Sequence, residues 1–244
     1  MKKALKIIAI IVVVVFLLLL ILPFVFKGKI VELVKQQANE NLRAKVEFND
    51  VSLSLIRNFP NLAVGIEDLS VVGIEEFEGD TLARIGNIGL VMDVMSVISG
   101  DQIVVKSINL DKPYFMVKVL EDGTANYDIA IASEDTTEEE TATEESAPLN
   151  LSINEYSISD GVIIYDDATF PMRMVIDDLD HVGNGDFAQD IFTLNTETHI
   201  QAFTLDYDGI KYANELKADL MADLAMNFET MRFEFMENEL DVNA

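Results

Sequence analysis

The chain has 244 residues, with 43 acidic against 17 basic residues, a formal net charge of −26, and neither Cys nor Trp. The lack of Cys excludes disulfides and cysteine-ligated metals. The acidic excess argues against nucleic acid, because that binding depends on Lys and Arg neutralising phosphates, and against broad docking on an anionic lipid surface.

A run of 20 uncharged residues, Ile7–Phe26, lies near the N-terminus, with Lys on both sides. A helix of this length spans about 30 Å, the hydrocarbon thickness of a bilayer. A cleaved signal peptide is the alternative, but its apolar core has only about 7–15 residues, and Phe24–Lys27 offers no small-residue cleavage site. We expect residues 1–26 to be a short cytoplasmic tail and a single-pass bacterial inner-membrane anchor, with the body in the periplasm.

Residues 27–44 follow with apolar side chains at helical spacing, which predicts a juxtamembrane helix. From residue 45 the period changes to two. Val51, Leu53 and Leu55 alternate with serines, and the same alternation recurs at Val64–Ile66, Phe115–Val119 and Leu149–Ile153. This pattern is typical of strands with one apolar face. Turn-forming residues separate the strands, at Asn58–Asn61, Glu121–Gly123, Asp160–Gly161, Gly183–Gly185 and Asp208–Gly209.

Three further segments complete the organisation of the chain. Asp93–Ser99 predicts a short helix. Residues 134–148 hold seven acids between Glu134 and Glu145, which predicts a disordered acidic loop between two parts of the body, 45–133 and 149–244. An interaction tail is the alternative function of that loop. Across it, Ile108–Pro113 and Tyr156–Gly161 form a faint internal repeat.

The segment Leu216–Phe228 fits two patterns. Leu at every fourth position suggests a helix, but seven apolar residues in strict alternation predict a long strand, and the alternation explains more positions. The same alternation resumes at Met231. A strand at the end of the sequence leaves an open sheet edge, so we expect the protein to continue beyond residue 244.

Acidic groups near a histidine invite a catalytic or metal-binding interpretation. Asp166–Asp167 and Asp177–His181 are the densest of them, but with 43 acidic residues such groups arise readily by composition. Asp178–Asp190 suggests calcium, yet it lacks the ligand spacing of an EF-hand. We therefore expect no catalytic residue, no metal and no cofactor, and we expect His199 on an exposed face.

Several motifs together resemble the N-terminal region of AsmA-family proteins, closest to those of Bacteroidota-type bacteria. They are the anchor followed by Val46–Leu62 and Glu67–Val71, then Phe77–Leu82, Ile108–Pro113, and the Asp122–Ile129 element that begins with Asp-Gly and contains Asn126. The resemblance covers nearly the whole chain, whereas relatives usually continue for several hundred residues more.

The resemblance implies a mainly β fold, in which a long, twisted, mostly antiparallel sheet curls into an apolar groove. It implies a non-enzymatic role in envelope homeostasis and outer-membrane biogenesis, similar to that of bridge-like lipid-transfer proteins, with membrane lipids as partners and envelope proteins as a further class. Strand alternation alone also fits a two-sheet sandwich, and without the resemblance it favours one.

On this reading the apolar side chains of the strands line the groove, and a charge at Val117 or Leu224 should abolish lipid loading. Two other functions stay open: a tether that binds a protein partner through its sheet edge, and an anchored hydrolase that uses the acidic cluster. The residues expected to line the groove are Leu53, Leu55, Val64, Ile66, Phe115, Val117, Val119, Leu220, Leu224 and Phe228.

Overall fold

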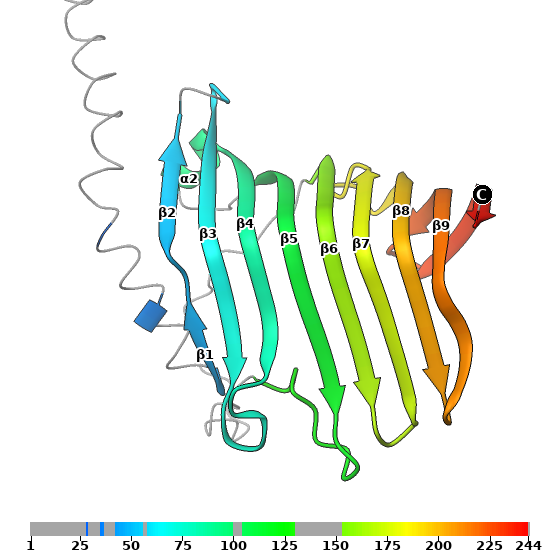
Figure 1. Ribbon diagram of the computed structural model, residues 1–244. Coiled ribbons are helices and arrows are strands. Elements are labelled where there is room, and N and C mark those ends of the chain that lie inside the picture. Colours follow the sequence, from blue (N-terminus) through cyan, green and yellow to red (C-terminus); the bar gives the residue numbers. More distant parts are fainter. Residues whose placement is uncertain are drawn as a thin grey trace, which may run out of the picture.

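The computed structural model describes residues 28, 35–36, 42–55, 58–99, 104–129 and 153–243. The predicted anchor and acidic loop lie outside these residues, and among the described helices none is long and apolar enough to cross a bilayer. The elements, shown in Figure 1, are β1 (Ala44–Glu47), β2 (Asp50–Ser54), β3 (Asn61–Gly73), η1 (Glu75–Phe77), β4 (Thr81–Asp93), α2 (Val94–Ser99), β5 (Val105–Val119), β6 (Glu155–Asp167), β7 (Met172–Asn184), β8 (Ile191–Tyr207), β9 (Ile210–Asn227) and β10 (Arg232–Val242).

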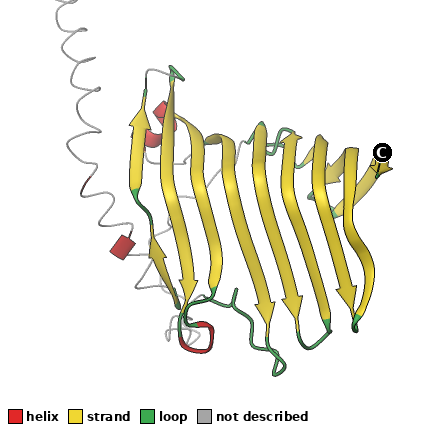
Figure 2. Ribbon diagram, in the orientation of Figure 1, coloured by secondary structure: helices red, strands yellow, loops and turns green. Residues whose placement is uncertain are grey.

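The protein is mainly β, and the described strands form one sheet of ten (Figure 2). β1 and β2 lie one after the other along β3, and the remaining strands follow in chain order to β10. Among the described strands only β5 and β6 pair in parallel, so the sheet is mixed, and it is not closed. The two-sheet sandwich is therefore wrong for the described part of the chain, because the strands on either side of the acidic segment share one sheet.

The two copies of the faint internal repeat lie side by side in the parallel strands β5 and β6. Ile108 lies beside Tyr156, and Leu110 lies beside Ile158, with the same register kept along both strands. The turn predicted at Asp160–Gly161 is wrong, because both residues lie inside β6. Asp160 has a positive φ of 53°, which marks a bulge in the strand and not a reversal of the chain.

A line of such residues crosses the sheet. Asp68, Lys112, Asp160, Asp178 and Glu215 all have φ between 51° and 54°. Each is left out of the residue pairing between neighbouring strands, and together they lie in a row across β3, β5, β6, β7 and β9. A bulge bends its strand and shifts the side-chain alternation by one residue. Apolar side chains on both sides of the row consequently stay on one face.

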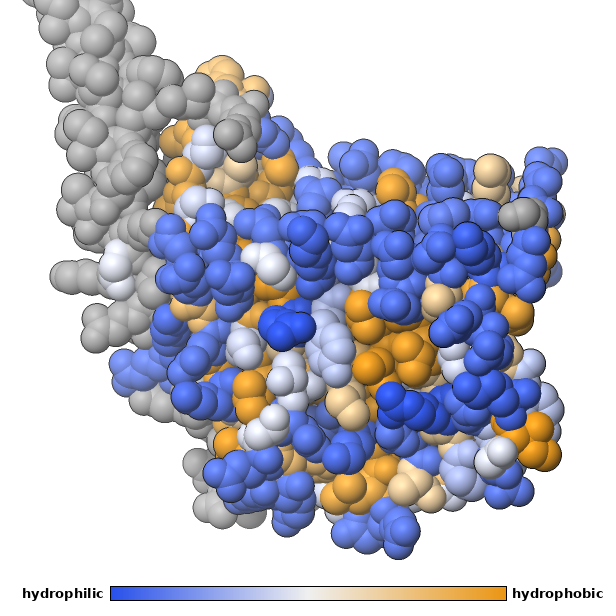
Figure 3. Space-filling model, viewed as in Figure 1, coloured by the Kyte–Doolittle hydropathy of each residue, from blue (hydrophilic) through white to orange (hydrophobic). Residues whose placement is uncertain are grey.

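The sheet has one apolar and one hydrophilic face. Figure 3 shows the hydrophilic face, on which apolar patches are interspersed among charged residues. In Figure 1, which has the same orientation, β10 passes behind β8 and β9, so the sheet curls toward its apolar face at this end. On that face Pro113 is fully buried, and Ile85, beside it in the register, is 5% exposed. Proline suits this position because a bulge does not need every backbone N–H in the ladder.

Several local predictions are confirmed. β9 is a single long strand over most of the ambiguous segment, and a turn at Asp208–Gly209 precedes it. Asp93 caps α2, since its Oδ1 accepts hydrogen bonds from Met95 N and Ser96 N at 2.9 and 3.1 Å. The strand expected up to Ile153 lies mostly outside the described residues, and Ile153 itself precedes β6. Of the juxtamembrane segment, the described Gly28, Lys35 and Gln36 are helical, and Ala44 already belongs to β1.

The Asp-Gly element after β5 has a structural role. Asp122 accepts a hydrogen bond from Thr124 N at 2.9 Å, and Gly123 supplies a φ of 88°. The chain then folds back so that Asn126, only 3% exposed, lies beside the end of β5. Its Oδ1 accepts from Lys118 N at 2.8 Å, and its Nδ2 donates to Met116 O at 2.6 Å. The side chain therefore satisfies strand backbone beyond the point where β4 ends its pairing with β5.

A second carboxylate organises the turn between β6 and β7. Asp167 Oδ1 accepts hydrogen bonds from Thr169 Oγ1 at 2.7 Å, Thr169 N at 2.8 Å and Phe170 N at 3.1 Å, while its Oδ2 accepts from Tyr165 OH at 2.8 Å. The Thr169 hydroxyl, followed by that of Tyr165, holds the pKa of Asp167 at about 2, below its usual value of 3.8. The ionised form is thus the one that the fold stabilises.

We expect Asp167→Asn to reduce stability at neutral pH, with the deficit shrinking in acid. The unfolded chain takes up a proton near pH 3.8 whereas the folded carboxylate keeps its charge down to about pH 2, so the stabilisation is lost as the pH falls through this window. Thermal unfolding of both proteins at pH 7 and pH 3, followed by circular dichroism, measures the change. An equal gap between them at the two pH values would contradict the assignment.

Candidate functional site

The strand register places eight of the ten predicted lining residues on the apolar face; Leu55 follows the end of β2 and Phe228 lies in the turn after β9. Leu53 pairs with Val64, and pairing continues in one row through β4 to β8 as far as Ala222 of β9. A second row, beyond the line of bulges, runs from Phe115 to Leu216. Because Leu216 and Ala222 alternate on the same side of β9, both rows share one face.

The exposure of this face increases toward its C-terminal end. Leu194 of β8 is buried, whereas Phe235 and Leu240 of β10 are 70% and 61% exposed. Phe235 lies opposite Leu224, and Leu240 lies opposite Leu220, so the exposed residues continue the predicted row by one strand. Large apolar side chains in contact with water are unfavourable by about 25 cal/mol per Å², which makes this end a surface suited to apolar contacts.

A cavity of about 300 Å³ lies on the apolar face. Its wall comes from β5, β6, β8 and the turn after β7, and apolar side chains dominate it. None of the ten predicted residues lines this cavity. Its floor is the parallel pair of β5 and β6, and the internal repeat in the sequence was the signal that could have predicted this pair. The lining residues are Ile108, Leu110, Ile153, Tyr156, Ser157, Ile158, Phe187 and Leu194.

A row of aromatic rings leads from the cavity toward the last strand. The ring of Phe187 lies 6.1 Å from that of Tyr156 and 4.8 Å from that of Phe192. Phe192 is followed by Phe228 at 5.8 Å and by Phe233 at 6.0 Å beyond it. These centroid distances are those of contacting aromatic pairs. The row gives a continuous apolar rim along one end of β6 to β10.

Polar groups interrupt this face beside the cavity. His181 Nδ1 lies 2.8 Å from Thr198 Oγ1, and His181 Nε2 lies 3.2 Å from the hydroxyl of Tyr156. Burial lowers the pKa of His181 and raises the pKa of Tyr156, so both side chains are neutral at neutral pH. This cluster was not predicted, since the three residues come from three different strands.

The acidic cluster around His181 does not converge on one point. Asp177 and Asp180 lie on the hydrophilic face, while His181 lies on the apolar face with the uncharged partners just described. Among the described residues no group of three or more His, Asp or Glu side chains is arranged to hold a metal. His199 is on the hydrophilic face, as expected, and contacts Asp219 with its side chain 53% exposed.

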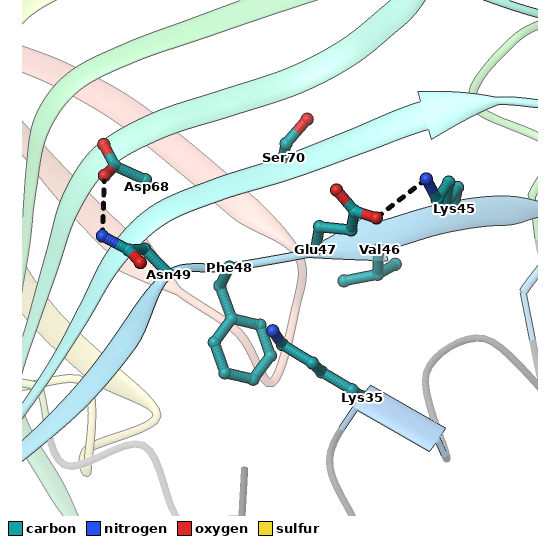
Figure 4. Close-up of a pocket in the computed structure, with 8 residues that line it drawn as sticks. All are labelled: Lys35, Lys45, Val46, Glu47, Phe48, Asn49, Asp68 and Ser70. Carbon is teal, nitrogen blue, oxygen red and sulfur yellow. Dashed lines mark hydrogen bonds and ion pairs between the residues drawn. The ribbon is translucent and has the colours of Figure 1, made fainter. Parts of the chain in front are cut away.

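A second cavity, of about 490 Å³, lies at the β1 edge (Figure 4). Charged and polar groups line it together with Phe48. The ammonium group of Lys35 lies 4.5 Å from the centre of the Phe48 ring, and Lys45 pairs with Glu47 at 2.8 Å. Although larger, this cavity offers mainly polar side chains, so the cavity on the apolar face is the better candidate for an apolar ligand.

An open mixed sheet with one apolar and one hydrophilic face defines a class of single-sheet β proteins that present a long apolar surface. Comparison with family profiles identifies the chain further. The AsmA family profile matches residues 1–184, which end at the last residue of β7, and the chain belongs to the AsmA family. This membership indicates a function associated with the cell envelope. Comparisons with curated proteins and with solved structures found no match.

Proposed function

We propose that this protein binds or conducts phospholipid along a groove formed by the apolar face of its sheet, as part of outer-membrane and envelope homeostasis. Ile7–Phe26 would anchor it in the inner membrane and place the sheet in the periplasm. The observation that carries the proposal is the extended apolar face of an open ten-stranded sheet. Each CH₂ group of an acyl chain buried there contributes about 0.8 kcal/mol, while the headgroup stays in water.

The curvature of the sheet supports a groove over a flat surface. The row of bulges bends five strands along one line, and β10 passes behind its neighbours on the side of the apolar face. The proposed activity needs no chemical step, no metal and no cofactor. Binding would be passive, with the apolar strands as the wall and the aromatic row as one rim.

Native mass spectrometry with lipid extraction tests this function. The body, Lys45–Ala244, is purified without detergent after circular dichroism has shown that it is a folded β protein. We expect phospholipid to remain bound at about one molecule or more per chain, since a chain with several buried CH₂ groups dissociates slowly. A folded body that carries no lipid, even after incubation with phospholipid vesicles, would contradict the proposal.

A tether is the second candidate, favoured by the outer edge of β10. Every residue of this strand is exposed, and among the described strands it pairs only with β9. An unpaired edge can accept a strand from another protein. A lipid-free body that forms a defined complex with an envelope protein would support the tether in place of lipid binding.

A further inference from the structure

The polar cluster beside the cavity is built into the apolar face by the packing of Tyr156. Its ring lies over Gly183, where an added Cβ would come within 2.3 Å of the ring carbons. Glycine at this position is therefore what lets the ring lie close against β7. The ring centre is then 5.4 Å from that of His181, and the hydroxyl is within hydrogen-bonding reach of the imidazole.

The three side chains form a hydrogen-bonded chain whose direction is set by the tautomer of His181. Neutral His181 can carry its proton on Nε2. The Thr198 hydroxyl then donates to Nδ1, and Nε2–H donates to the oxygen of Tyr156. In this arrangement the Tyr156 hydroxyl keeps its own hydrogen to donate.

Tyr156 lines the cavity, so a ligand seated there can supply the acceptor for that hydrogen. We propose that the Tyr156 hydroxyl donates a hydrogen bond to the ester carbonyl oxygen of an acyl chain seated in this cavity, so that the protein selects ester-linked lipids. This inference rests on the proposed function and adds a chemical criterion to it. An ester carbonyl is the one strong acceptor that a diacyl lipid places at the start of its apolar chains.

The chemistry around the site fits an uncharged acceptor. Burial holds both His181 and Tyr156 neutral, so the cluster offers a hydrogen bond without a net charge. Carboxylates of Glu155, Asp186 and Asp190 belong to the segments that form the cavity, and all three residues are exposed. They would repel an anionic headgroup, which makes a zwitterionic phospholipid the suitable probe.

The experiment compares two phosphatidylethanolamines of equal chain length, one with ester-linked and one with ether-linked chains. The full chain, purified in a mild detergent, is mixed with equal amounts of both, and bound lipid is counted by native mass spectrometry. We expect the ester lipid to be retained about fivefold over the ether lipid, the effect of one neutral hydrogen bond. Tyr156→Phe should bring this ratio to about one.

Tyr207→Phe is the matched control, because Tyr207 also lies on the apolar face, contacts Phe170 and Tyr212, and lies away from the His181 cluster. It should keep the preference for the ester lipid. Equal binding of both lipids by the unchanged chain, or a preference that survives Tyr156→Phe, would overturn the inference while the proposed function stands. Binding of neither lipid would instead overturn the proposed function.

Discussion

Replacing Asn126 with alanine should destabilise the fold by about 3 kcal/mol. The side chain is 3% exposed and bonds the N–H of Lys118 and the carbonyl of Met116. Alanine leaves both backbone groups without partners, and each buried unsatisfied group costs about 1–3 kcal/mol. For a chain of this size the melting temperature should fall by about 10 °C, as measured by circular dichroism.

Two further variants separate this role from a general loss of polarity. Asn126→Asp keeps an oxygen for Lys118 N but turns a second oxygen toward the carbonyl of Met116, at the position of the amide nitrogen now 2.6 Å away. It should be unstable at neutral pH and partly recover near pH 3, where the carboxyl is protonated and can donate. Asn214→Ala, at an exposed position of β9, should change stability by less than about 0.5 kcal/mol. Equal effects of Asn126→Ala and Asn214→Ala would contradict the assignment.

The sequence allows the class of fold to be predicted because alternation is a local signal. Strands such as β9 are long enough for period two to outweigh the competing fourfold spacing of leucine. The family motifs can also be recognised in the sequence, and in the structure they stabilise the fold. In the turn between β2 and β3, Asn61 N donates a hydrogen bond to Asn58 O at 2.7 Å. Asp80 forms an ion pair with Lys118 at 2.8 Å.

The bulges escape prediction for a physical reason. Asp is a residue that tolerates a positive φ, so it can signal such a position in the sequence. Lys112 and Glu215 have the same positive φ, but their residue types do not predict it. The sequence does show a shift in the alternation of apolar residues: in β5 the apolar positions are Ile108 and Leu110, then Pro113 and Phe115. If this shift is interpreted as a turn, the segment is predicted as two strands. If it is interpreted as a bulge, the segment is one strand with the apolar residues of both halves on the same face.

The cavity and its polar cluster depend on contacts between strands, which no single strand encodes. Tyr156, His181 and Thr198 meet because β6, β7 and β8 pair in a fixed register. The parallel step from β5 to β6 is what brings Ile108 and Ile158 to one cavity. The internal repeat in the sequence reflects this register. It predicts the pairing of β5 with β6 if the two copies are known to be neighbours in the sheet.

Introducing a charge at Leu224 should reduce bound lipid by about tenfold or more. Leu224 lies on the apolar face of β9, between Leu194 of β8 and Phe235 of β10. An acyl chain on this surface would have to remove water from the new carboxylate of Leu224→Asp, at a cost of several kcal/mol, and about 1.4 kcal/mol already corresponds to tenfold in affinity. Native mass spectrometry of variant and unchanged protein, loaded from the same phospholipid vesicles, measures the loss.

The same strand supplies the matched control. Met221 lies three residues before Leu224, on the hydrophilic face, and is 58% exposed. Met221→Asp adds the same charge to the same strand, so it should keep the fold and the bound lipid. Leu224→Ala removes the side chain without adding charge and should retain most of the lipid, because the remaining wall is unchanged. If Leu224→Asp folds and still loads lipid like Met221→Asp, the two faces of β9 do not differ toward lipid, and the apolar face of this sheet is not the binding surface.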